Sequence, residues 1–241
     1  MFLGQSLPKP PTTGNLETIS SALDHVSLDF SDVRYVKGDM IGFALACFSL
    51  VPQCLLVMYA TLILSRREAE TILLFMGQVG NELVNHWLKN QIQQNRPTLQ
   101  HGLGFGMPSA HAQFVSYYAT FITLWILFRV RYNFSFTRKV TRVGSLIGLS
   151  LVVAYSRVYL HYHSGAQVLI GYVLGIVLAI GWFIVVCLLR DLGIIDLLLD
   201  TSIARWLYIK DTAAEKSSFV REEYMEWRRW RSKMKLLMKV Q

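Results

Sequence analysis

The sequence predicts an all-α fold, a polytopic membrane bundle of about five membrane-crossing helices followed by a C-terminal interfacial helix. Three observations predict it. Hydrophobic residues make up 53% of the chain and charged residues only 17%, whereas soluble domains carry about 25% charged residues. The apolar residues form runs of about 20 residues, the length that crosses a bilayer. Lysine and arginine gather in certain loops and in the C-terminal tail, as they do in multi-span membrane proteins.

Five segments have the features of membrane-crossing helices. The 69–92 segment is only half apolar, so we expect its polar face to look into the bundle. The other four are predominantly apolar and lie near 40–64, 109–129, 143–162 and 166–189. The chain then divides into a lumenal N-terminal segment, a membrane core and a cytoplasmic basic amphipathic tail, at 1–38, 39–190 and 191–241.

The basic residues set the expected orientation. Most of the 24 lysines and arginines lie in the turn at 65–68, the loop at 129–142 and the tail after 189. Such loops stay on the cytoplasmic side of a membrane, so the second and fourth helices end on the opposite, lumenal or exterior side. We therefore assign the net charge of +8 to contact with a membrane and not with nucleic acid. The tail is expected to lie on the membrane surface as a helix, with a solvated charged helix as the alternative.

The first of three polar clusters on the non-cytoplasmic side is "KNQIQQNRP". Lys89 and Arg96 would lie two turns apart on one helical face, and Pro97 would end that helix at Arg96. Cations near the end of a span often only extend toward the interface, so this pair alone is weak evidence for a site.

The second cluster is "GMPSAH". Ser109 is well placed to cap the next span. The backbone amides of Ala110 and His111 would then be free at the positive end of the helix, where anions bind. An ordinary cap beside an interfacial histidine is the simpler alternative.

The third cluster is "SRVYLHYHSGAQ". Ser156 and Arg157 lie near the end of the fourth span, and Ser164 can cap the fifth. His163 lies at the junction between them. Ionisable residues at such positions normally face the protein interior and serve a function.

Together the three clusters would place three cations, two helix starts and two histidines around one site. That arrangement suits phosphoryl transfer by electrostatic stabilisation. Residues 83–190 contain no Asp or Glu, whereas a magnesium or two-metal site requires carboxylate oxygens. We therefore expect no metal and no cofactor, with zinc on histidines as the alternative. One histidine would be the nucleophile and the other the acid, and the residues alone leave open which is which.

The ordered motifs Lys-x6-Arg-Pro, Pro-Ser-x-His and Ser-Arg-x5-His resemble the type 2 phosphatidic acid phosphatase superfamily. In this chain they run from Lys89 to His163. Within the superfamily, "GMPSAHAQF", "SRVYLHYH…Q" and the preceding Asn81, Glu82 and Asn85 are most similar to the branch that hydrolyses dolichyl pyrophosphate. The resemblance implies an enzyme of the endoplasmic-reticulum membrane with a lumenal active site.

The resemblance also implies a role for each site residue. His163 would attack phosphorus and carry a phosphohistidine, and His111 would protonate the leaving group and then activate water. The phosphoryl oxygens would be bound by the remaining site residues, Lys89, Arg96, Ser109, Ala110 and Arg157. No metal takes part, and the partners are the lipid substrate and the membrane.

Gln167 departs from the wider superfamily, which has an aspartate four residues after the nucleophile. A glutamine oxygen would accept the imidazole N–H and select one tautomer, but without a full charge. Alternatively, Gln167 only completes a capping box with Ser164 at the start of the last span.

Three further residues are secondary candidates. Ser156 directly precedes the site arginine, and His161 could contact substrate, although an interfacial histidine is the simpler interpretation. Glu82 lies on the same helical face as the site lysine but about 10 Å deeper. We expect Glu82 to pair inside the bundle, with Asn85 or His86.

The leading hypothesis is hydrolysis of dolichyl pyrophosphate to dolichyl phosphate and inorganic phosphate, which would recycle the carrier lipid of protein N-glycosylation. Another lipid phosphate phosphatase, acting on phosphatidate or sphingoid phosphates, is the nearest alternative. A non-catalytic lipid or anion transporter is the alternative from a different class. The glycosylation sequon "NFS" at Asn133 falls on the cytoplasmic side and should stay unmodified.

Overall fold

The computed structural model describes residues 25–27, 33–97, 105–129, 136–211 and 220–237. Within these residues the regular structure is helical apart from one small antiparallel sheet and isolated bridges. The sheet pairs β1 (His25–Ser27) with β2 (Arg34–Val36). The predicted all-α class is confirmed.

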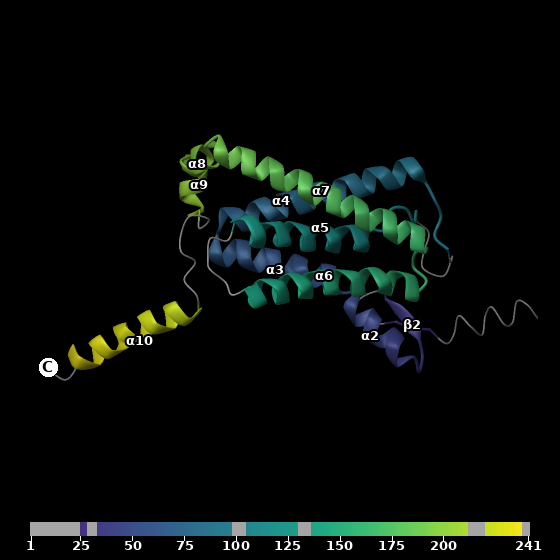
Figure 1. Ribbon diagram of the computed structural model, residues 1–241, viewed down its shortest axis with the longest axis horizontal. Helices are drawn as coiled ribbons and strands as arrows, with labels where there is room; N and C mark the ends of the chain where they lie inside the picture. Colours follow the sequence, from purple (N-terminus) through teal and green to yellow (C-terminus); the bar gives the residue numbers. More distant parts are fainter. Residues whose placement is uncertain (1–24, 28–32, 98–104, 130–135, 212–219, 238–241) are drawn as a thin grey trace, which may run out of the picture.

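Five elements run side by side along the long axis of the molecule and form the bundle (Figure 1). They are α3 (Val51–Arg66), α4 (Ala69–Ile92), α5 (Ala110–Leu124), α6 (Phe136–Tyr159) and α7 (Gly165–Asp191). Among the described residues, two stretches are long and apolar enough to cross a membrane, judged by length and composition only: Met40–Arg66 and Gly165–Asp191. The expectation of five membrane crossings remains a prediction.

The first predicted span is broken into two helices. The structure has α2 (Met40–Phe48), whose first turn is capped by Asp39 at the amide of Ile41, and then α3. The break falls just before Pro52. Proline has no N–H to donate and its ring clashes with the carbonyl four residues earlier, so one continuous helix cannot run through this point.

Other boundaries differ less from the predictions. α4 covers the expected 69–92 and α7 the expected 166–189. α5 continues into one π-helical turn, η2 (Trp125–Arg129). α6 begins before the expected 143, because basic residues that are good helix formers extend its first turns.

α5 packs closely against α7 because two glycines of α7 face it. A Cβ atom on Gly171 would lie 2.6 Å from the carbonyl oxygen of Ser109, and one on Gly175 would lie 2.3 Å from that of Gln113. No side chain fits at either position, so these glycines let the α7 backbone approach the start of α5. The contact sets the distance between the beginnings of the two helices, where the site lies.

The outward face of α7 is apolar. Val173, Val177, Ile184 and Leu188 are exposed along it. A row of exposed apolar side chains of this length is typical of a surface that contacts lipid or another protein.

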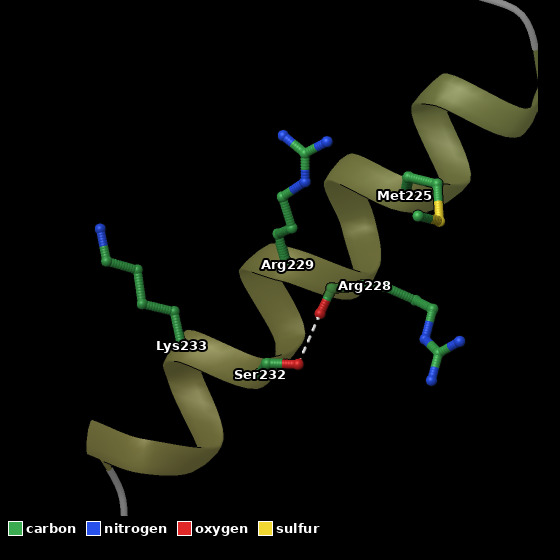
Figure 2. A pocket seen from close by; sticks show the side chains of 5 residues that line it. All are labelled: Met225, Arg228, Arg229, Ser232 and Lys233. Atoms are coloured by element: carbon green, nitrogen blue, oxygen red, sulfur yellow. Dashed lines mark hydrogen bonds between the residues drawn. The ribbon is translucent and has the colours of Figure 1, made fainter.

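The described residues of the C-terminal tail are largely helical, in agreement with the prediction. α8 (Ile194–Leu199) and α9 (Ser202–Trp206) follow the bundle, and α10 (Val220–Leu237) is drawn apart from it (Figure 1). In α10 the side chains of Arg229 and Lys233 point to one side and that of Arg228 to another (Figure 2). Exposed Trp227 and Trp230 lie on the same helix. This mixture suits the interfacial helix that the sequence predicts.

Candidate active site

Four chain segments meet at one end of the bundle. They are the end of α4, the start of α5, the end of α6 and the start of α7 (Figure 1). His111 lies within electrostatic reach of Arg157, His163, Lys89 and Arg96. The structure therefore brings both histidines and all three cations of the sequence analysis into one place.

Lys89 and Arg96 do not share a helix. α4 ends at Ile92, and Gln93 takes a left-handed conformation, with φ of 51°, while its N–H donates to the carbonyl of Lys89 at 3.0 Å. Arg96 follows in an extended segment, next to the bridge between Asn95 and the segment that leads to α5. The expected helical continuation to Pro97 is wrong, because the left-handed residue ends α4 first. The chain turns there and directs Arg96 back toward the histidines.

The start of α5 offers hydrogen-bond donors to an anion. Ser109 is the N-cap, as predicted, but its side chain makes no capping bond. Its hydroxyl is buried and has no hydrogen-bond partner among the described residues. The N–H of Ser109 donates to the carbonyl of Gln167 at 3.1 Å. The first amides of α5, those of Ala110 and His111, lie at the positive end of the helix.

Arg157 is a buried cation at the end of α6, with 4% of its surface exposed. Its Nε and Nη1 atoms have no hydrogen-bond partner in the part of the chain that the structure describes. The guanidinium lies 4.0 Å from the centre of the Tyr162 ring. The hydroxyl of Tyr162 accepts the backbone N–H of Arg34 at 2.8 Å. The segment around β2 thus supports the ring on which Arg157 rests.

His163 lies between α6 and α7 and is 5% exposed. Burial, together with the positive charges of Arg157 and Arg96, lowers the pKa of His163 from 6.5 to about 3. The imidazole is therefore neutral at neutral pH, and one of its ring nitrogens keeps a free lone pair. Its Nδ1 atom lies 3.3 Å from Oε1 of Gln167.

Gln167 makes both of the contacts that the sequence leaves open. Its backbone N–H donates to the hydroxyl of Ser164 at 3.3 Å, and its Oε1 accepts the N–H of Ser164 at 3.2 Å, which completes a capping box. The same Oε1 faces His163. Capping and contact with the histidine are not alternatives in this structure.

The secondary candidates are placed less centrally. Ser156 is buried and donates to the carbonyl of Val153 at 2.7 Å, within its own helix. His161 is exposed, and its backbone is left-handed with φ of 57°. Glu82 is half-buried, and the expected partner Asn85 uses its amide nitrogen on Gln113, at 2.7 Å.

Gln113 was missed by the sequence analysis. Its Nε2 atom donates to the backbone and side-chain oxygens of Asn81, both at 2.9 Å, and its Oε1 accepts from Asn85. The three side chains are buried and join α4 to α5 directly beneath the two helix ends that carry Lys89 and His111. The sequence does contain a sign of this network, since Asn81 and Asn85 lie one turn apart on the polar face of α4 and would need a polar partner inside the bundle.

Comparison with known proteins places this site in a family. Residues 70–190 match the PAP2 superfamily. The dolichyldiphosphatase of Saccharomyces cerevisiae is 34% identical over 85% of this chain and 89% of that protein. The dolichyldiphosphatase 1 of Homo sapiens is 39% identical over 63% of this chain and 68% of that protein.

A solved structure shows the same fold. The transmembrane PAP2 type phosphatidylglycerolphosphate phosphatase of Bacillus subtilis aligns with a TM-score of 0.51 and 19% identity, over 71% of this chain and 85% of that one. The helical bundle therefore has the fold of that protein. On the match over 70–190 and the identity to full-length relatives, the chain belongs to the PAP2 superfamily.

Proposed function

We propose that this chain hydrolyses dolichyl pyrophosphate to dolichyl phosphate and inorganic phosphate. One observation carries the proposal: two histidines lie within reach of three cations, with unpartnered buried donors on Arg157 and Ser109 among the described residues. Buried donors without partners cost free energy unless a ligand satisfies them. A phosphate group is the anion that such a set of donors fits, and the relatives named above supply the substrate class.

The first chemical step forms a bond between Nε2 of His163 and the terminal phosphorus. The bond from that phosphorus to the bridging oxygen breaks, and the electron pair leaves with dolichyl phosphate. His111, in the first turn of α5, enters this step as an imidazolium in the presence of the anionic substrate and gives its proton to the leaving oxygen. Arg157, Lys89, Arg96 and the α5 amides stabilise the charge on the phosphoryl oxygens.

The second step releases phosphate. His111, now neutral, takes a proton from a water molecule that attacks phosphorus, and the P–N bond to His163 breaks. The imidazole returns to its neutral form, which its low pKa favours. The same residue thus acts as acid and then as base, as microscopic reversibility requires of a two-step displacement.

We propose that the reaction needs no metal. The three cations already supply the positive charge that a metal would bring to the phosphoryl oxygens. Among the described residues, no three His, Cys, Asp or Glu side chains gather as a metal-binding group.

A groove next to the site suits a lipid substrate. It has a volume of about 330 Å³ and is lined mainly by apolar side chains of α3, α4 and α5, with Gln78, Glu82 and His86 among them. His86 is one turn before Lys89 on α4, and the lining residue Phe114 is one turn after His111 on α5. An isoprenoid chain could follow this groove while its head group occupies the site.

We further propose that the site faces the lumen of the endoplasmic reticulum, with the tail after residue 190 in the cytosol. The distribution of basic residues supports this orientation. Recycling of the N-glycosylation carrier would be the purpose of the reaction. Asn133, which lies outside the described residues, should carry no glycan, and a glycan found there by mass spectrometry would reverse the orientation.

The substrate is tested by phosphate release from the purified full-length chain. Dolichyl pyrophosphate, phosphatidate and sphingosine 1-phosphate are compared at matched detergent concentration. We expect the highest kcat/KM with dolichyl pyrophosphate. If the protein released no phosphate from saturating dolichyl pyrophosphate but hydrolysed phosphatidate, it would be a phosphatase for other lipid phosphates. No release from any of them would favour the transporter.

A further inference from the structure

The side chain of Gln167 is held at both of its ends by backbone groups. Its Oε1 accepts the N–H of Ser164 at 3.2 Å, and its Nε2 donates to the carbonyl of Asn95 at 3.0 Å. A backbone N–H only donates and a carbonyl only accepts. The orientation of the Gln167 amide is therefore fixed by the fold and does not depend on a choice between nitrogen and oxygen.

The fixed amide has a consequence for His163. The atom of Gln167 that faces Nδ1 of His163, at 3.3 Å, is the oxygen Oε1. Since this oxygen only accepts, Nδ1 must carry the proton in the neutral imidazole. The lone pair is then on Nε2, the nitrogen that attacks phosphorus.

The other end of Gln167 reaches the segment that carries Arg96. Besides the Asn95 carbonyl, Nε2 donates to Oε1 of Gln94 at 3.3 Å. The carbonyl of Gln94 in turn accepts the N–H of Gly106 at 2.6 Å. A Cβ atom on Gly106 would lie only 2.8 Å from both terminal atoms of Gln167. The carboxamide is thus enclosed between the segment before Arg96 and the segment before α5.

We propose that the Gln167 carboxamide is a positioning link. It fixes the tautomer of His163 and, through Asn95 and Gln94, the position of Arg96 relative to His163. The proposal rests on the proposed function, because it assigns His163 as the nucleophile. It also gives a physical reason for glutamine at this position. A carboxylate could accept from Ser164 and His163, but it could not donate to the Asn95 carbonyl, and its second oxygen would face two other oxygens.

Gln167→Glu separates this link from the helix cap. Glutamate serves in a capping box as well as glutamine does, and the acceptor for His163 is retained. Only the donor toward Asn95 and Gln94 is lost. We measure kcat, KM and the melting temperature of the full-length protein in detergent, with dolichyl pyrophosphate as the substrate, for wild type, Gln167→Glu and Gln167→Met.

We expect Gln167→Glu to lower kcat/KM of the folded protein by about 10- to 100-fold, mainly through kcat, because the donor toward Asn95 and Gln94 is lost. The melting temperature should fall as well, since the second carboxylate oxygen is buried without a donor. Gln167→Met should lose at least as much activity. An active wild type together with a Gln167→Glu variant of unchanged kcat/KM would overturn the link. A wild type without any turnover would instead defeat the proposed function, so the two failures are distinct.

A second substitution tests the contact itself. Gln94→Lys, introduced into the Gln167→Glu variant, places a donor opposite the new carboxylate. We expect it to recover about 3-fold or more of the lost kcat/KM, as a charge-assisted hydrogen bond would. Gln91→Lys, an exposed residue of α4 with the same charge change, is the matched control and should recover nothing. Equal recovery by the two lysines, or none by Gln94→Lys, would contradict direct contact between positions 94 and 167.

Discussion

Each end of the bundle holds an arginine, buried at one end and partly buried at the other, and their surroundings are opposite. At the end remote from the histidines, Arg190 of α7 contacts Glu70 at the start of α4, at 2.7 Å, and also Asp211. At the histidine end, the Arg157 Nε and Nη1 atoms have no hydrogen-bond partner among the described residues, and other cations lie near it. A buried charge is retained either because a counter-ion is built in or because a ligand supplies one.

The end of the bundle that contains Glu70 and Asp211, called here the carboxylate end, contributes to the stability of the fold. Arg190 joins the last turn of α7 to α4 and to the chain after α9. The segment after α9 is also held by two backbone hydrogen bonds. The N–H of Ala69 donates to the Lys210 carbonyl, and the N–H of Lys210 donates to the Arg67 carbonyl, both at 3.0 Å. The arginine at one end is thus paired within the fold, whereas the arginine without a carboxylate is the one for which we propose a phosphate ligand.

The largest expected effect is the loss of the nucleophile. His163→Ala should lower turnover of dolichyl pyrophosphate by about 10⁴-fold or more, because no covalent intermediate can form. Substrate binding, measured by equilibrium dialysis with a detergent-solubilised lipid, should persist. Residual turnover within about 10-fold of wild type would assign the attack to another residue.

The next largest effect is expected when each of the two arginines, Arg157 and Arg190, is replaced by methionine. Arg157→Met should lower kcat/KM by about 10²- to 10³-fold, because it removes a donor that stabilises the phosphoryl oxygens. Its melting temperature should not fall, since a buried charge with no carboxylate partner is removed.

Arg190→Met is the matched variant at the opposite end. We expect it to reduce the free energy of unfolding by about 3 kcal/mol, because Glu70 and Asp211 lose their partner, while the folded fraction keeps its kcat/KM. The comparison fails if Arg190→Met inactivates a fully folded protein, or if Arg157→Met unfolds it with normal activity in the remaining fraction.

A smaller effect concerns stability against pH. The pKa of His163 is about 3 in the folded protein and 6.5 in its ordinary state. Below pH 6.5 the unfolded chain therefore binds a proton that the folded chain does not, and stability falls as the pH falls toward 3. At pH 5 the loss from this residue is about 2 kcal/mol. Thermal unfolding of wild type and His163→Gln at pH 7.5 and pH 5 measures it, and an equal loss in both proteins would rule out His163 as the cause.

The smallest effect is expected at an exposed ion pair. Arg66 and Glu68 lie 2.9 Å apart near the carboxylate end, with 52% of the Arg66 side chain exposed. Glu68→Gln should change the free energy of unfolding by less than about 1 kcal/mol, since water screens such pairs. A loss as large as that of Arg190→Met would mean that exposure does not separate the two pairs.

Much of the site follows from short sequence motifs, because the motif residues sit at helix ends whose positions hydropathy predicts. Ser109 and Ser164 begin α5 and α7 as expected. The geometry at Lys89 and Arg96 could not be predicted in this way. It depends on the left-handed backbone conformation of Gln93, which the spacing of residues in the sequence does not indicate. The contact between Gln167 and Asn95 joins positions far apart in the chain, and only the folded bundle shows it.

The central claim is that His163 becomes covalently phosphorylated while the three cations hold the phosphate. It is tested with dolichyl pyrophosphate that carries ³²P in its terminal phosphate, mixed with the full-length protein in the presence of a chelator and quenched in alkaline detergent, in which phosphohistidine survives. We predict label on the peptide that contains His163, in wild type and in Arg190→Met but not in His163→Ala. Phosphate release from wild type without any labelled peptide, or label that survives in His163→Ala, would contradict the account.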